Sequence, residues 1–197
     1  MASEIDLVDI GGGNIGSVRR CLERMGVRYR EASIDSPPSG DRPLLLPGVG
    51  AFGPVMQHLR KSNFEPKLKA LIKNGTPYLG ICIGMQILFD GSEEAENCPG
   101  LAIIPGEVVA FTSGKVPQIG WNLIEPKFDG QQEGYVYFVN SYYPKPVDER
   151  VVSYSANYYV PFCAAVKDRN ITAFQFHPEK SGDFGQTLLR RWLDENS

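Results

Sequence analysis

The chain has 197 residues, of which 42% are hydrophobic and 22% are charged, and its formal net charge at pH 7 is −3. This composition excludes an intrinsically disordered protein, and 20 basic against 23 acidic residues leave no excess positive charge for a nucleic-acid backbone. No signal peptide is recognisable, and the uncharged stretch at residues 74–89 is too short and too rich in glycine to span a bilayer. We therefore expect one cytoplasmic domain that contacts neither nucleic acid nor membrane.

The first half of the chain alternates short apolar runs with segments of helical periodicity. Glycine or proline follows most of these runs, which marks where each element ends. Such an alternation of strands and helices predicts a parallel sheet that is covered on both faces. Strands are expected at residues 5–10, 27–31, 44–46 and 77–81, and helices at 14–25, 54–61, 65–73 and 84–89.

The second half is rich in short β-type runs that are separated by Gly, Pro, Asn and Asp, a pattern typical of antiparallel hairpins. We expect strands at 101–111, 116–124, 134–139, 150–155, 162–167 and 171–176, and a last helix at 184–194. The fold class is therefore α/β: a mostly parallel twisted sheet with helices on both faces, to which the second half adds antiparallel strands. No repeat or linker divides the chain, so residues 1–197 are expected to form a single domain.

A glycine-rich segment follows the first expected strand. Gly11 to Gly16 satisfy G-x-G-x-x-G, and Glu31 lies 20 residues beyond Gly11, as in dinucleotide-binding proteins. Three consecutive glycines make an accidental match easy, and a tight turn with Asn14 as the helix cap explains the same residues. We favour the turn and expect no NAD or other cofactor, although a dinucleotide oxidoreductase stays a distant alternative.

A single cysteine is flanked by glycines at the junction between an expected strand and the next helix. Cys82 stands between Gly80 and Gly84, the spacing of a nucleophile elbow with sulfur in place of a hydroxyl. The start of a helix favours a thiolate there, and the N–H of Ile83 could face an oxyanion. The other cysteines (Cys21, Cys98 and Cys163) have no such flanks and no C-x-x-C pairing, so we expect no metal and interpret them as small buried or inert side chains.

A thiolate nucleophile requires a base, and the chain has only two histidines. His58 lies in an expected helix, where a surface or core role is the simpler interpretation. His177 precedes Pro178, which keeps the chain extended, so Glu179 projects on the same side and could orient the imidazole. We predict a catalytic triad of Cys82, His177 and Glu179.

Segment 47–50 (PGVG) follows a buried strand, where ligand sites collect in α/β sheets. Its glycines allow a close approach of the backbone to a substrate, and its N–H groups, at Val49 in particular, could complete an oxyanion site with Ile83. A simple turn between strand and helix is the alternative.

Segments 47–50, 80–86 (GICIGMQ) and 177–181 (HPEKS), in this order, resemble the class I (triad) glutamine amidotransferases. Segments 9–14, 117–122 (PQIGWN) and 137–142 (YFVNSY) are similar more narrowly to the glutaminase subunits of imidazole glycerol phosphate synthases, of histidine biosynthesis. The resemblance implies hydrolysis of L-glutamine to glutamate and ammonia, which passes to a (β/α)8 cyclase subunit in a heterodimer. It also implies that glutamine is held by Gly48, Gly50, Gln86, Asn140, Ser141 and Tyr142.

Some positions depart from the family pattern. Asn140 and Gln118 stand where histidine is common, but neither belongs to the triad. Two alternatives therefore stay open: a paralogous subunit that feeds ammonia to another acceptor, such as a surface-sugar precursor, and a subunit that only regulates its partner. Asn14, Trp121 and Lys180 lie in motif segments without a chemical task, so we expect them at the partner interface, with a core Trp121 and a merely solvated Lys180 as the simpler alternative.

Overall fold

The computed structural model describes residues 4–11 and 15–196. Within these residues, nine strands form one sheet in the order β2-β1-β3-β4-β12-β11-β10-β7-β8. The first five in that order run parallel to one another, and the last four extend the sheet in antiparallel fashion. The bounds are β1 Glu4–Asp9, β2 Arg28–Ser33, β3 Leu44–Gly48, β4 Tyr78–Cys82, β7 Gln118–Pro126, β8 Gly134–Asn140, β10 Val152–Tyr158, β11 Val160–Asp168 and β12 Ile171–Phe174.

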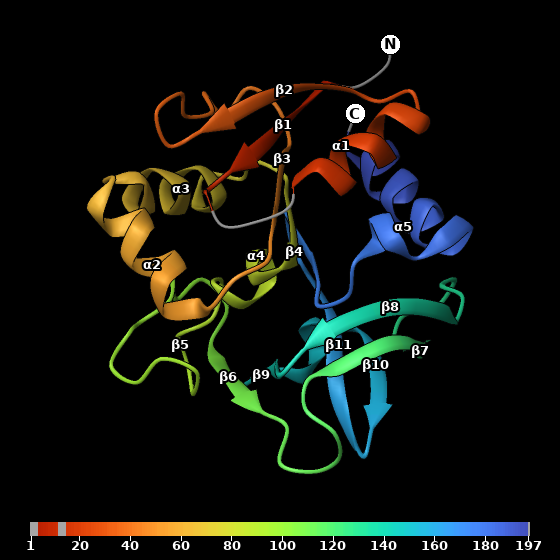
Figure 1. Ribbon diagram of the computed structural model, residues 1–197. Helices are drawn as coiled ribbons and strands as arrows, with labels where there is room; N and C mark the ends of the chain where they lie inside the picture. Colours follow the sequence, from red (N-terminus) through yellow and green to blue (C-terminus); the bar gives the residue numbers. More distant parts are fainter. Residues whose placement is uncertain (1–3, 12–14, 197) are drawn as a thin grey trace.

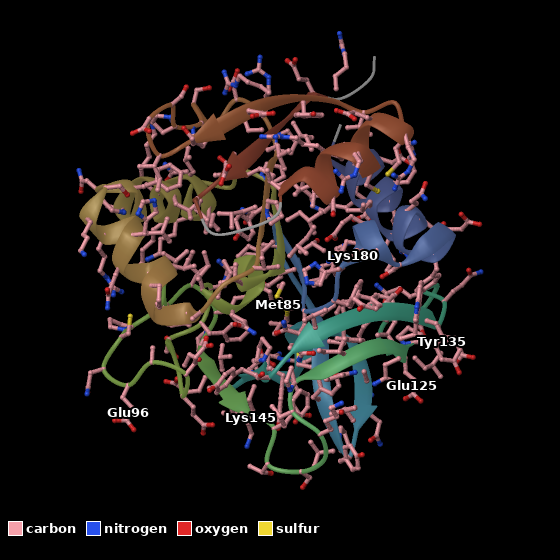
Figure 2. The ribbon with its side chains drawn as sticks, in the orientation of Figure 1. Met85, Glu96, Glu125, Tyr135, Lys145 and Lys180 are labelled. Carbon is pink, nitrogen blue, oxygen red and sulfur yellow. The ribbon has the colours of Figure 1, made fainter. Side chains whose placement is uncertain are left out.

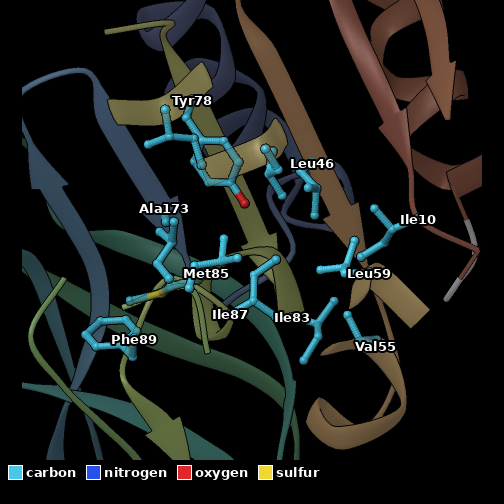
Figure 3. Packing of buried hydrophobic residues seen from close by; sticks show 14 of the residues in the cluster. Ile10, Leu46, Val55, Leu59, Tyr78, Ile83, Met85, Ile87, Phe89 and Ala173 are labelled. Carbon is cyan, nitrogen blue, oxygen red and sulfur yellow. The ribbon is translucent and has the colours of Figure 1, made fainter. Parts of the chain in front are cut away.

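Helices cover both faces of the parallel half (Figure 1). On β3, Leu44 and Leu46 pack with α2 and α3, whereas Leu45 between them packs with α1 and α5, because neighbouring strand residues point to opposite faces. Figure 3 shows the first of these two cores, around Leu46, Val55 and Tyr78. The helices are α1 Ile15–Arg24, α2 Phe52–Lys61, α3 Phe64–Lys73, α4 Ile83–Gln86 and α5 Gly182–Glu195.

A small second sheet lies beside the antiparallel half and is formed by β5 (Gly91–Ser92), β6 (Gly106–Ala110) and β9 (Tyr142–Pro146). Two short 3-10 helices, η1 (Glu149–Val151) and η2 (Pro178–Lys180), complete the fold. In the described part of the chain, no helix is long and apolar enough to cross a membrane.

The predicted α/β class is confirmed, with parallel strands first and antiparallel strands later. The strand predicted at 101–111 was too long, since β6 begins only at Gly106. The helix predicted at 84–89 also ends early, at Gln86. Both errors have one cause: the carbonyls of Ile87, Leu88 and Phe89 accept hydrogen bonds from the N–H groups of residues 101–104, which holds both segments as packed loop. Strand β9 was missed because its two prolines look like strand breakers in the sequence.

Candidate active site

Three segments that the sequence marks as functional (47–50, 80–86 and 177–181) meet at the carboxyl ends of three neighbouring parallel strands. Strand β4 lies between β3 and β12, and all three run parallel. Gly48 at the end of β3 is in register with Cys82 at the end of β4, and Phe174 at the end of β12 is in register with Ile81. Segment 47–50, which we call the glycine loop, lies at the carboxyl end of β3, and Cys82 and His177 lie at or just beyond the carboxyl ends of β4 and β12. Ligand sites of parallel sheets form at these ends.

The turn at Cys82 has the geometry of a nucleophile elbow. Cys82 has a φ of 56° and a ψ of −108°, a conformation that non-glycine residues adopt rarely and that marks functional sites. A Cβ atom on Gly80 would lie 2.4 Å from the Gly84 carbonyl oxygen, and one on Gly84 would lie 2.1 Å from the Leu46 carbonyl oxygen. Both flanking positions therefore exclude any side chain, because the obstacle in each case is backbone.

A hydrogen bond from a buried tyrosine holds the same turn in place. Tyr78 lies within the core (Figure 3), and its fully buried hydroxyl donates a hydrogen bond of 2.7 Å to the carbonyl oxygen of Gly84. Burial raises the pKa of this phenol well above its usual range, so the hydroxyl remains a donor. This bond fixes the first turn of α4, whose first residue is Ile83. The Ile83 N–H has no acceptor within its own helix, since the first N–H groups of a helix never do.

The imidazole of His177 is paired with a carboxylate. Its Nδ1 lies 2.9 Å from Oε1 of Glu179, and both side chains are only 3% exposed. Burial by itself lowers the pKa of His177, but the interactions of the imidazole with Cys82 and Glu179 outweigh burial and raise the pKa to about 9. At neutral pH the imidazole is therefore protonated. Its Nε2 atom is buried and makes no well-formed hydrogen bond within the described residues, so it is the nitrogen that remains available for chemistry.

The backbone of His177 is clamped to β8. Its N–H donates to the Tyr137 carbonyl at 2.9 Å, and its own carbonyl accepts from the Ser181 hydroxyl at 2.6 Å. The same hydroxyl accepts from the Tyr137 N–H at 2.9 Å, which closes the connection. The role of Ser181 is not evident from the motif itself; its place four residues after His177, directly after the short helix that begins at Pro178, is the signal that could have suggested one.

The residues expected to hold substrate lie on two sides of Cys82. Gly48 and Gly50 belong to the glycine loop, where Gly50 has a φ of 155° and Val49 is 41% exposed. On the other side, Gln86 and Asn140 are buried, and their amide nitrogens both donate to the Tyr142 carbonyl, at 3.3 Å and 3.0 Å. Segment 140–142 is thus tied to α4.

Two of the three expected interface residues lie at the surface beside the triad. Trp121 on β7 is 57% exposed, stacks edge-on against Tyr137 and approaches Gly182, so a core role for it is wrong. Lys180 is exposed in η2, between α5 and β8 (Figure 2). Asn14 lies outside the described residues. His58, the other imidazole, is exposed on α2.

The glycine-rich segment near the N-terminus is described only in part. Gly11 has a φ of 75°, and its N–H donates to the Asp9 side chain at 2.8 Å, which is a tight turn at the end of β1. The rest of the expected turn, with Asn14 as the helix cap, lies outside the described residues, so this turn stays a prediction.

Comparison with known proteins assigns the family. The sequence matches the family described as Glutamine amidotransferase class-I over residues 6–196. The chain belongs to this family. It is 42% identical to "Imidazole glycerol phosphate synthase subunit HisH" of Geobacillus thermodenitrificans, with 96% of this chain and 94% of the relative covered. It therefore groups with the HisH subunits among the class-I glutamine amidotransferases.

Two further similarities extend this picture. The chain is 39% identical to "Imidazole glycerol phosphate synthase hisHF, chloroplastic" of Arabidopsis thaliana, where the match covers 97% of this chain but 34% of the plant protein. A crystal structure titled "glutamine amidotransferase" superposes with a TM-score of 0.78 at 20% identity, covering 96% of this chain and 97% of the other. At that identity the superposition establishes the class-I amidotransferase fold alone.

Proposed function

We propose that this chain hydrolyses the side-chain amide of L-glutamine to glutamate and ammonia, with Cys82 as nucleophile, His177 as acid and base, and Glu179 as the group that orients His177. The observation that carries the proposal is the meeting of a strained, glycine-flanked Cys82 with a buried His177–Glu179 pair at adjacent strand ends. The dependence of the His177 pKa on Cys82 supports the same pairing.

The first half of the reaction uses the protonated imidazole. The Cys82 sulfur attacks the amide carbon, and the carbonyl oxygen takes the negative charge. Backbone N–H groups of Ile83 and Val49 would stabilise that oxyanion, since they lie at the elbow and in the neighbouring loop. As the carbon–nitrogen bond breaks, His177 gives its proton to the leaving nitrogen. Ammonia departs, and a thioester remains on Cys82.

The second half returns the enzyme to its starting state. His177, now neutral, takes a proton from water as the water oxygen attacks the thioester. The carbon–sulfur bond breaks, glutamate leaves, and the sulfur becomes a thiolate beside the imidazolium. Glu179 at 2.9 Å stabilises the imidazolium and fixes which ring nitrogen faces the sulfur.

Glutamine would lie between the glycine loop and segment 140–142. Gly48 and Gly50 present backbone without side chains. Because the Gln86 amide nitrogen is turned inward to Tyr142, its carbonyl oxygen is the group that could meet the substrate. The buried Oδ1 atom of Asn140 has no partner among the described residues, and it could accept from the substrate ammonium. Ser141 and Tyr142 would contribute their main chain.

We further propose a (β/α)8 cyclase subunit as the acceptor of the ammonia, in a cytoplasmic heterodimer that makes imidazole glycerol phosphate. The family placement supports this, as does the plant relative, in which a region like this chain is about a third (34%) of a longer protein named hisHF. Four free cysteines fit a reducing compartment.

The surface next to the triad suits such a partner. On the β7–β8 hairpin, Ile119, Trp121 and Tyr135 are 62%, 57% and 62% exposed, and Tyr135 is visible at the hairpin in Figure 2. Exposed aromatic side chains of this kind dominate protein interfaces. Lys180 adds a charge on the same side of His177.

The test is a pair of assays on the complex of this chain with the (β/α)8 cyclase encoded beside it. Cys82→Ala should abolish glutamine-dependent synthesis while synthesis from added ammonium salt continues, because only the sulfur is lost. Cys98→Ala, a partly exposed thiol elsewhere, is the matched control and should behave as wild type. Glutamine hydrolysis that persists in Cys82→Ala would overturn the proposal.

A further inference from the structure

A line of buried side-chain amides leads to the Cys82 sulfur. The first is Gln175, whose side chain is 0% exposed and whose Nε2 lies 3.8 Å from Cys82 Sγ. Gln175 stands two residues before His177, just beyond the end of β12, and its own N–H donates to the Ala164 carbonyl of β11 at 2.9 Å. The donor is therefore held by the sheet and does not belong to the triad.

The remaining amides determine which end of Gln175 faces the sulfur. The Tyr142 carbonyl can only accept hydrogen bonds, so the atoms of Asn140 and Gln86 that approach it must be their nitrogens. The same Gln86 nitrogen lies 2.9 Å from Gln175, and the Gln175 atom that it meets must be the oxygen. The Gln175 nitrogen is then left to face Cys82. The orientation of the Gln175 amide thus follows from the Tyr142 backbone carbonyl, which lies two hydrogen bonds away through Gln86.

We infer that Gln175 is a further residue of the glutaminase machinery, which stabilises the thiolate of Cys82 by donating its amide N–H to the sulfur. The inference rests on the proposed function, in which Cys82 is the nucleophile. A buried donor favours the charged form of its acceptor, and a hydrogen bond to a charged group is stronger than one to a neutral group. The bond is therefore strongest when the sulfur is a thiolate and weakens once the sulfur carries an acyl group.

This difference gives Gln175 a task that His177 does not have. The thiolate is the leaving group when the thioester is hydrolysed, and at that moment His177 has just received a proton from water. The amide of Gln175 stabilises the departing sulfur by a hydrogen bond alone and takes no part in proton transfer. Gln86 acts behind it as a positioning residue, since it holds the Gln175 oxygen away from the sulfur.

The experiment measures how fast iodoacetamide alkylates Cys82 between pH 5 and pH 10, in the full chain, by mass spectrometry of the peptide that carries it. Gln175→Met keeps the size of the side chain and removes the donor, and Gln175→Asn keeps an amide but withdraws it from the sulfur. Both should move the alkylation profile of Cys82 to higher pH and slow alkylation near pH 6 by about tenfold or more, the size expected for losing a hydrogen bond to a charged group. In both, kcat for glutamine should fall more than KM changes.

The chain supplies its own controls. Burial raises the pKa of the Cys163 thiol to about 12 and also raises that of Cys21, so neither should compete for the reagent. The partly exposed Cys98 accepts a hydrogen bond from Arg60 at 3.4 Å, so the reference for an unperturbed thiol is free cysteine in the same solution. Gln131→Met replaces a glutamine beside α5, away from the sulfur, and should leave the profile unchanged.

The outcomes separate the two proposals. If the wild-type profile of Cys82 matches that of free cysteine, the nucleophile itself is misassigned and the proposed function fails. If Cys82 is more reactive than free cysteine but a folded Gln175→Met or Gln175→Asn chain keeps the wild-type profile, the role of Gln175 is overturned and the triad stands.

Discussion

The charge state of His177 is the most direct physical test of the site. The imidazole owes its raised pKa, about 9, to contacts with Cys82 and Glu179 that outweigh burial. Glu179→Gln keeps the shape of the pair and removes its charge. A buried charge-assisted hydrogen bond at 2.9 Å contributes roughly 1.5–3 kcal/mol, and one pH unit corresponds to about 1.4 kcal/mol. The pKa of His177 should therefore fall by about one to two pH units, to between about 7 and 8.

The titration can be followed by NMR of the imidazole nitrogens in a His58→Gln background, which leaves a single histidine in the chain. Glu65→Gln is the matched control, because Glu65 is a partly buried carboxylate that pairs with Arg60 instead. It should leave the His177 curve unmoved. The reasoning is refuted if Glu179→Gln titrates like wild type, or if wild-type His177 is already neutral at pH 7.

The remaining predictions concern the elbow and the interface. Tyr78→Phe should lower the free energy of unfolding in urea by about 1–3 kcal/mol, since the Gly84 carbonyl loses its buried donor, whereas Tyr154→Phe, whose hydroxyl makes no bond to the described residues, should change it little. Gly84→Ala places a Cβ 2.1 Å from backbone and should abolish the selective alkylation of Cys82; a reactive, folded variant would contradict the elbow. Trp121→Ala should weaken cyclase binding at least tenfold, as measured by titration calorimetry. Tyr159→Ala, which removes another aromatic side chain that is 67% exposed, is the control and should bind like wild type. Equal affinities of Trp121→Ala and wild type for the cyclase would place the interface elsewhere.

The sequence sufficed for those parts of the site that depend on local geometry. The spacing of Gly80, Cys82 and Gly84 alone predicts a sharp turn, and the structure shows the reason: backbone atoms occupy the space that side chains at both glycines would need. His177 and Glu179 are likewise two residues apart on an extended chain, so their contact follows from strand geometry.

The features of the fold and of the site that could not be predicted from the sequence depend on contacts between segments that are distant in the chain. Gln86 and Gln175 are 89 residues apart in the chain, and nothing local fixes which atom of each amide faces the other. Gln175 lies two residues before His177, as Glu179 lies two residues after it, so the alternation of an extended chain also predicts that Gln175 points toward the site. The early end of α4 has the same origin, because residues 101–104 take over the hydrogen bonding of the segment that follows it.

The antiparallel half of the sheet gives the triad a mechanical connection to the surface where a partner would bind. Strand β8 holds the backbone of His177 through Tyr137 and Ser181, and the ring of the same Tyr137 contacts Trp121, which is 57% exposed on β7. Strand β8 also ends at Asn140, whose amide shares the Tyr142 carbonyl with Gln86. A partner that shifts this hairpin would therefore act on the imidazole at the middle of β8 and on the buried amides at its carboxyl end. The parallel strands position the nucleophile, and the added hairpin is the element through which its surroundings can be adjusted.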